Sequence, residues 1–396
     1  MKKLIALAVL LAAGPAQAQE PPAEAAPAEP VPSEPPAPPG EEPKAEKAPK
    51  AEKAPKEPKE PKESDIDIGG RVITLISLSN AGETFDPGDM AGAIALDSVR
   101  LEASYRFRDF VRAVVEVEAA GNNVEVRDAY ARLDFYGGRG RLRAGYFKTA
   151  FSGLALTSRM RLPTVDRGVV HDILLDAYRI AGRRPGVQLE WRGEGTLIRP
   201  FVDVGVWQGD TIELLSDGTG WRGAARGGIE LASELQEHDV AVGAEIRTLR
   251  PTPFDPPETF WAAELDGRWE LDTGKSVFSL WGEVLVGSTH ITTGTEDAIF
   301  TGVRGIAAWR AGGRERNAWY LQPAVALYFL DADADIRRDA VWEVTAGVSG
   351  GMWRRWRAQL FVEVRRVGAQ VPAGLAGDGQ PLGERNALLA ALALEF

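Results

Sequence analysis

A regular alternation of apolar and polar residues from Asp65 to Phe396 limits the folds open to this chain more than any other feature. Segments of about ten residues carry the alternation, as transmembrane barrel strands do, and turns rich in Gly, Pro, Asn and Asp separate them. From Val99 to Phe107, apolar residues hold one parity and Arg, Glu and Ser the other. One face of each strand therefore suits lipid and the other water. A soluble all-β sandwich is the less favoured alternative, because its polar faces are more mixed.

The number of alternating segments predicts the size of the fold. An even number is typical of single-chain bacterial barrels, and about 16 strands leave a water-filled lumen. The predicted fold class is therefore all-β, a transmembrane antiparallel β-barrel of about 16 strands. The segments lie near residues 66–79, 94–107, 111–119, 127–136, 140–147, 181–192, 197–208, 221–232, 238–249, 259–271, 275–288, 299–310, 316–330, 338–349, 355–367 and 386–396.

Aromatic residues and the end of the chain fit the same fold. Many aromatics fall toward segment ends, where the interfacial girdles of a barrel belong. The last segment ends on Phe396, which is similar to the C-terminal signature of outer-membrane proteins. The aromatics expected at the interfaces include Trp191, Trp207, Trp261, Trp269, Trp309, Trp319, Tyr320, Tyr328, Phe329 and Trp342.

The N-terminal part of the chain has a different composition. Lys2 and Lys3, an apolar run and the small-residue pattern Ala16-Gln17-Ala18 predict a signal peptide over residues 1–18. Residues 19–64 contain little but Pro, Ala, Glu and Lys, so we expect a disordered, low-complexity linker. The predicted location is the bacterial outer membrane, with this linker in the periplasm. The chain then divides into a signal peptide, a linker and a barrel over 65–396.

Composition argues against several classes of function. The chain has no cysteine and only three scattered histidines, so we expect no metal site and no cofactor. The three histidines lack the motif context of a catalytic triad, so the sequence does not predict an enzyme. The net charge of −11 argues against a nucleic-acid partner. From residue 65 onward, positive charge comes from 35 arginines and only two lysines, against 46 acidic residues.

The longest interruption between strands, residues 148–180, is the first candidate site. Loops of such length are usually functional, and in a wide barrel an inward loop would narrow the lumen. Its cations are the candidates for a pore constriction that binds anions, because guanidinium groups suit oxyanions. The alternative is that they pair with lumen carboxylates and stabilise the wall. These four residues are Lys148, Arg159, Arg161 and Arg167.

Parity assigns a second set of charged residues to the lumen wall. For the wall arginines, ion pairing across strands is the favoured interpretation. The set comprises Arg100, Arg132, Arg141, Arg143, Glu264 and Arg268.

A short stretch around the long loop resembles a known family. It reads Gly145-Tyr146-Phe147-Lys148-Thr149-Ala150-Phe151, then Leu156-Thr157-Ser158-Arg159, Leu162-Pro163 and Asp166-Arg167. This pattern resembles the phosphate-selective porin O and P family. The resemblance implies a homotrimeric porin whose third loop constricts the channel, with Lys148, Arg159 and Arg167 at the matching positions. The wall has almost no lysine and many acids, so phosphate selectivity stays open.

Two functions are consistent with these features of the sequence. The first is an outer-membrane porin for passive diffusion of small hydrophilic solutes, with selectivity for phosphate-like anions as one option. Its surroundings would be the lipid bilayer, lipopolysaccharide, and small ions and solutes. The second is a structural anchor that tethers the outer membrane to peptidoglycan, or to another periplasmic partner, through residues 19–64.

Overall fold

The computed structural model describes residues 64–80, 90–121, 123–209, 220–233, 236–249, 258–289, 291, 298–312, 318–372, 375 and 382–396. The chain divides into two units, Met1–Lys59 and Glu60–Phe396, and the described residues belong to the second. The signal peptide over 1–18 and the linker, apart from its last residue, lie outside the described residues. Both stay predictions.

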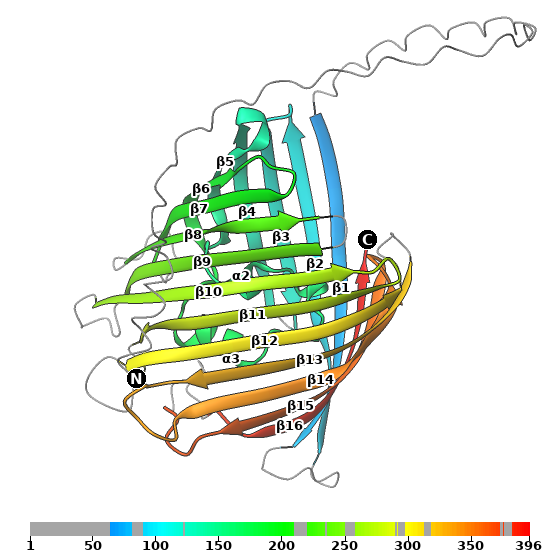
Figure 1. Cartoon of the computed structure of the whole chain (residues 1–396), viewed down its shortest axis with the longest axis vertical. Coiled ribbons are helices and arrows are strands. Elements are labelled where there is room, and N and C mark those ends of the chain that lie inside the picture. Colours follow the sequence, from blue (N-terminus) through cyan, green and yellow to red (C-terminus); the bar gives the residue numbers. More distant parts are fainter. Residues whose placement is uncertain are drawn as a thin grey trace, which may run out of the picture. The chain divides into compact units, whose positions relative to one another are not determined.

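Within the described residues, sixteen antiparallel strands close into a barrel (Figure 1). Each strand pairs with its neighbours in sequence, and β1 pairs with β16 to complete the ring. The predicted fold class and strand positions are confirmed. The strands are β1 Ser64–Asn80, β2 Ala91–Phe107, β3 Val111–Ala120, β4 Asn123–Phe135, β5 Gly140–Lys148, β6 Arg183–Arg192, β7 Ile198–Gln208, β8 Trp221–Ala232, β9 Gln236–Leu249, β10 Glu258–Asp272, β11 Ser276–Thr289, β12 Ala298–Gly312, β13 Trp319–Asp331, β14 Ala340–Met352, β15 Trp356–Val367 and β16 Arg385–Glu395.

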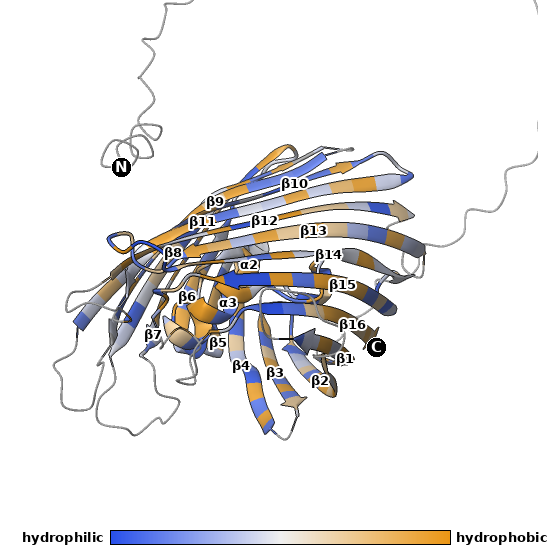
Figure 2. Ribbon diagram, turned by 90° about the horizontal axis from the view of Figure 1, so that it is seen from below, coloured by the Kyte–Doolittle hydropathy of each residue, from blue (hydrophilic) through white to orange (hydrophobic). Residues whose placement is uncertain are grey.

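The alternation of the sequence becomes two faces of the barrel wall. On β11, Trp281, Glu283 and Leu285 point inward and are buried. Phe278 and Leu280 point outward and are 44% and 54% exposed. Figure 2 shows the same banding along the strands. The outward apolar residues form the surface expected to contact lipid, because apolar side chains face the hydrocarbon in such barrels.

The connections differ between the two ends of the barrel. At the end that holds residues 108–110 and 353–355, each connection spans three to six residues. We call this the short-turn end. At the opposite end, the long-loop end, connections extend up to the 34 residues of 149–182. This asymmetry is usual for outer-membrane barrels, which have short periplasmic turns and longer extracellular loops.

Three of the aromatics expected at the interfaces lie elsewhere. Trp207, Tyr320 and Tyr328 point inward and are buried, with exposed fractions of 2%, 7% and 0%. Position near a strand end predicted an interfacial ring, but parity directs these side chains into the barrel. There they pack against other inward residues, as Tyr328 does in the cluster around the long loop.

The helices of the described residues are short, and most lie in the long connection. These are α2 Gly153–Leu156, η3 Arg159–Arg161, α3 Val169–Asp172 and η4 Ile173–Ala177, with η2 Tyr136–Gly138 in a turn. No helix in the described part of the chain is long and apolar enough to cross a membrane.

Candidate functional site

The connection from residue 149 to 182, which we call the inserted loop, folds into the barrel. Figure 2 shows its short helices within the ring of strands. Its apolar side chains join one buried cluster with inward residues of β11 to β14, and the rings of Tyr178 and Phe300 lie 4.7 Å apart. Burial of a Leu, Ile or Val side chain contributes roughly 1.5–3 kcal/mol. Apolar contact therefore holds the loop against one side of the wall.

Four buried wall arginines, which we call the clamp arginines, also hold the inserted loop. They are Arg222 of β8, Arg247 of β9, Arg304 of β12 and Arg357 of β15, each at most 5% exposed. Three of them donate to loop carbonyls, and Arg304 donates to a loop hydroxyl. Carbonyls at the ends of short helices lack backbone partners, and guanidinium donors satisfy them. The acceptors are Arg179 O and Ala181 O for Arg222, Tyr178 O for Arg247 at 2.9 Å, Ser152 Oγ for Arg304 at 2.7 Å, and Arg159 O, Met160 O and Leu162 O for Arg357 at 3.2, 3.3 and 2.6 Å.

Three carboxylates of the wall meet beneath the start of the loop. Oxygens of Glu264, Asp266 and Glu283 lie within 4.8 Å of one another. Arg226 pairs with Asp266 at 2.7 Å and with Glu264 at 3.4 Å, and Arg304 pairs with Glu283. The two guanidinium groups therefore offset much of the acidic charge. This cluster forms part of the base on which the loop lies.

A cavity of about 810 Å³ remains beside the inserted loop. The loop and inward residues of β1 to β11 line it, and its charged lining comprises twelve cationic and eight acidic side chains. The barrel from residue 65 onward is acidic, so positive charge is concentrated around the open space. The cations are Arg71, Arg100, Arg127, Arg143, Lys148, Arg159, Arg161, Arg167, Arg183, Arg192, Arg226 and Arg268.

All four cations predicted for the constriction line this cavity. Lys148 donates to the carbonyls of Ala155 and Leu156 in α2. Arg167 donates to the carbonyls of Leu154 and Thr157. These two side chains therefore stabilise the fold of the loop and also contribute positive charge to the cavity lining.

The other two predicted constriction residues occupy the loop tip, Ser158–Arg161. Arg159 donates to the carbonyl of Val165 at 3.0 Å and forms an ion pair with Asp97 of β2. Arg161 is exposed to the lumen, and within the described residues its side chain has no hydrogen bond or ion pair. Arg161 is therefore the predicted cation with the greatest freedom to meet a solute.

The predicted wall residues form ion pairs along the lumen. Arg100, Arg143 and Arg268 line the cavity, and the other three lie outside its lining. Such pairing is the arrangement expected if these residues stabilise the wall. Their roles in permeation stay predictions. The pairs are Arg100 with Glu118 at 3.1 Å, Arg132 with Asp134 at 2.9 Å, Arg141 with Asp134 at 3.6 Å, Arg143 with Glu190 at 2.7 Å, Glu264 with Arg226 at 3.4 Å and Arg268 with Glu237 at 2.9 Å.

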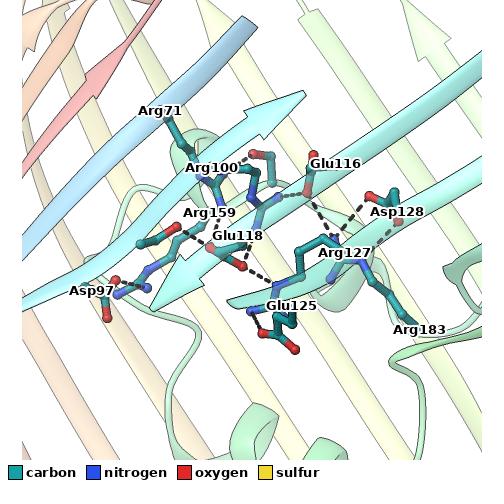
Figure 3. Close-up of polar contacts among 12 residues, drawn as sticks. Arg71, Asp97, Arg100, Glu116, Glu118, Glu125, Arg127, Asp128, Arg159 and Arg183 are labelled. Atoms are coloured by element: carbon teal, nitrogen blue, oxygen red, sulfur yellow. Dashed lines mark hydrogen bonds and ion pairs between the residues drawn. The ribbon is translucent and has the colours of Figure 1, made fainter. Parts of the chain in front are cut away.

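Sequence reasoning missed several charged residues beside the loop tip. Figure 3 shows Arg71, Arg127 and Arg183 directed toward the carboxylates that also pair with Arg100, beside the pair of Asp97 and Arg159. Arg183 begins β6 and pairs with Asp128 at 3.0 Å. The only signal for two of the missed residues, Asp97 and Arg127, is that each stands next to a second polar residue within a strand.

A tight contact in the loop gives a first prediction. Gly168 has φ of +74°, and a Cβ there would lie 2.5 Å from the ring of Tyr328. Gly168→Ala is expected to destabilise the seated loop by about 1–3 kcal/mol, through backbone strain and overpacking. Gly274→Ala is the matched control, because Gly274 has φ of +79° but no atom within 4 Å of that Cβ. Thermal unfolding in detergent measures both, and equal losses of stability would contradict the contact.

The comparisons with known proteins agree with this geometry. Residues 88–212, which span β2 to β7 and the inserted loop, match the family model of the phosphate-selective porin O and P family. The resemblance seen in the sequence is therefore confirmed over this part of the chain. No curated protein matches the sequence.

Solved outer-membrane porins share the fold at low sequence identity. An anion-selective porin from Comamonas acidovorans is 12% identical, with 84% of this chain and 100% of that chain covered and a TM-score of 0.54. The outer-membrane channel DcaP of Acinetobacter baumannii is 13% identical, with 84% and 97% covered and a TM-score of 0.53. OmpT of Vibrio cholerae, in a trimer form, is 11% identical, with 84% and 99% covered and a TM-score of 0.50.

Proposed function

We propose that this protein is an outer-membrane porin, a water-filled channel for passive diffusion of small hydrophilic solutes with a preference for anions. The observation that carries the proposal is the cavity beside the inserted loop, with its excess of four positive charges. Cationic side chains around a narrow aqueous passage raise the local concentration of anions and lower that of cations.

The exposed cationic side chains support a channel that prefers anions over a channel that passes small solutes regardless of their charge. The side chains of Arg127 and Arg143 keep 33% and 22% of their surface accessible while they pair with wall carboxylates. Arg161 adds a guanidinium at the loop tip that has no ion pair with any described residue. Guanidinium groups match oxyanions through two parallel hydrogen bonds, which favours phosphate-like or carboxylate-bearing solutes over chloride.

Vesicle swelling tests the diffusion channel. Vesicles that contain the folded protein are expected to swell in an isotonic monosaccharide faster than in an isotonic tetrasaccharide, because the loop narrows the lumen. Vesicles with heat-denatured protein are the control and are expected not to swell. Failure of the folded protein to admit either sugar would contradict the porin function.

We also propose that the porin assembles as a homotrimer. Support comes from the family resemblance and from the trimer form of Vibrio cholerae OmpT, which has the same fold. Native mass spectrometry of the detergent complex is expected to give three times the mass of one chain.

The tether function depends on residues 19–64, of which only Ser64 is described.

A further inference from the structure

Two register shifts occur in the strand pairing of the described residues, and they lie on either side of β3. Between β1 and β2, Ile73 pairs with Ser98 and Thr74 with Leu96, so Asp97 has no paired residue. Between β3 and β4, Glu116 pairs with Asp128 and Val117 with Val126, so Arg127 has none. Each is a β-bulge, in which one extra residue bends the strand and redirects a side chain.

The bulges place one additional charge each in the lumen. In a regular strand, Asp97 would face away from its inward neighbour Ser98, and Arg127 away from Asp128, toward lipid. The extra residue lets both members of each polar pair face inward. It also keeps Leu96 and Val126 outward, where they are 48% and 49% exposed. The two polar pairs therefore account for the bulges, because a charge on the lipid face is unfavourable.

The two redirected charges have different partners (Figure 3). Arg127 contacts Glu118 and, at 3.2 Å, Glu125, both on the wall. Asp97 contacts Arg159 of the inserted loop. Only the Asp97 bulge therefore connects the wall to the loop.

The contact of Asp97 is made at the loop tip. On the β15 side, Arg357 donates to backbone carbonyls of this tip. On the other side, Arg71 of β1 donates to Ser158 Oγ at 3.4 Å, and Asp97 holds the Arg159 side chain. The side chains of Asp97 and Arg159 are 22% and 20% exposed, so water reaches the pair, and Arg159 lines the cavity.

We propose that Asp97 is a positioning and specificity-determining residue of the channel. It holds the Arg159 guanidinium, fixes the loop tip beside the cavity and offsets one positive charge at the passage. This inference rests on the proposed porin function. If Asp97 only contributed charge, any carboxylate of the lumen would have the same effect.

The experiment compares two neutral variants on one strand. Asp97→Asn removes the carboxylate that holds the loop tip. Glu102→Gln removes a carboxylate that lines the cavity beside the loop. Among the described residues, Glu102 pairs with Arg112 at 3.8 Å and forms no hydrogen bond or ion pair with the loop. In about 0.1 M salt, a unit charge about 6 Å away changes the local concentrations of chloride and potassium about twofold in opposite directions, so their ratio changes roughly three- to fourfold. Both variants are therefore expected to raise the chloride-to-potassium permeability ratio, by about threefold or more for Asp97→Asn.

Loop position is measured separately with a thiol probe. The chain has no cysteine, so Met160→Cys introduces a single thiol at the loop tip. In this background, Asp97→Asn is expected to accelerate labelling by a water-soluble maleimide and to increase open-channel current noise. Glu102→Gln is expected to change neither. The charge swap Asp97→Arg with Arg159→Asp is expected to restore slow labelling.

Different outcomes would contradict the role of Asp97 and the proposed porin function. Equal labelling rates in Asp97→Asn and in the parent would overturn the positioning role, as would a charge swap that labels as fast as Asp97→Asn alone. Channel steps with an unchanged permeability ratio in Asp97→Asn would overturn the specificity role. Absence of channel steps in the unsubstituted protein would instead overturn the proposed porin function.

Discussion

Arg357→Ala is expected to release the inserted loop and to raise the single-channel conductance. The guanidinium of Arg357 is buried and donates three hydrogen bonds to loop carbonyls, the shortest 2.6 Å to Leu162. Loss of this donor costs about 1–3 kcal/mol for each buried carbonyl that is left unsatisfied. That loss falls on the seated loop, because the strands keep their backbone pairing. A loop that leaves its seat widens the lumen.

Arg354→Ala is the matched control for this variant. Arg354 lies in the turn between β14 and β15 at the short-turn end, is exposed, and carries the same charge. Its loss is expected to leave conductance unchanged. Conductance in Arg357→Ala equal to that of the parent, with the protein still folded as a barrel, would contradict the clamp. Circular dichroism and resistance of the barrel to unfolding in detergent establish that the fold is retained.

Arg161→Glu is expected to lower the chloride-to-potassium permeability ratio about tenfold. The substitution changes the charge at the loop tip by two units. In about 0.1 M salt, each unit at about 6 Å changes the local concentrations of chloride and potassium about twofold in opposite directions, so each unit changes their ratio roughly three- to fourfold. Arg161 is a suitable residue because it is exposed in the cavity and its side chain forms no hydrogen bond or ion pair in the described part of the chain. Arg161→Gln is expected to give about half of the effect on a logarithmic scale, since it removes a single charge.

A control substitution at the short-turn end distinguishes this local effect from an effect of the protein's net charge. Arg108→Glu makes the same two-unit change in the turn between β2 and β3, outside the cavity lining. We expect a much smaller change in the permeability ratio, because screening in salt weakens a charge beyond about 10 Å. Similar shifts for the two variants, measured by reversal potential under a KCl gradient, would contradict a constriction at Arg161.

The strands could be predicted from the sequence because the membrane makes parity unambiguous. A strand with lipid on one side and water on the other must alternate apolar and polar residues. The two faces of a strand such as β11 can therefore be identified from the sequence. Boundaries agreed closely, as for β3, expected over 111–119 and observed over Val111–Ala120. The C-terminal strand β16 was equally clear, although its neighbour β1 is distant in sequence.

The position of the long loop could not be predicted, because it depends on contacts between distant residues. Its length indicated a functional segment, and its cations were identified. Whether it points inward depends on Arg222, Arg247, Arg304 and Arg357, which come from four different strands. In the sequence these arginines resemble any other inward polar residue. Only the three-dimensional structure shows that three of them donate to loop carbonyls and that Arg304 donates to a loop hydroxyl.

At the two bulges, the alternation of inward and outward side chains fails to predict which way a residue faces. Asp97 and Arg127 would face lipid in regular strands, so alternation alone assigns them to the wrong face. The adjacent polar residues Asp97-Ser98 and Arg127-Asp128 were the available signal. A strand that carries two neighbouring polar residues within the membrane must either bury a charge in lipid or form a bulge. Trp207 and Tyr328 show the opposite case, in which parity was the better guide than position near a strand end.

Single-channel recording in planar bilayers, with reversal potential under a KCl gradient, is the decisive test of an anion-selective lumen narrowed by the inserted loop. The loop-narrowed, cation-rich lumen predicts discrete open-channel steps with chloride more permeant than potassium, and inorganic phosphate is expected to reduce the chloride current by competing for the arginines. A cation-selective channel would contradict the account of the constriction, because the acidic wall would then govern permeation. Absence of conductance would contradict the porin function altogether.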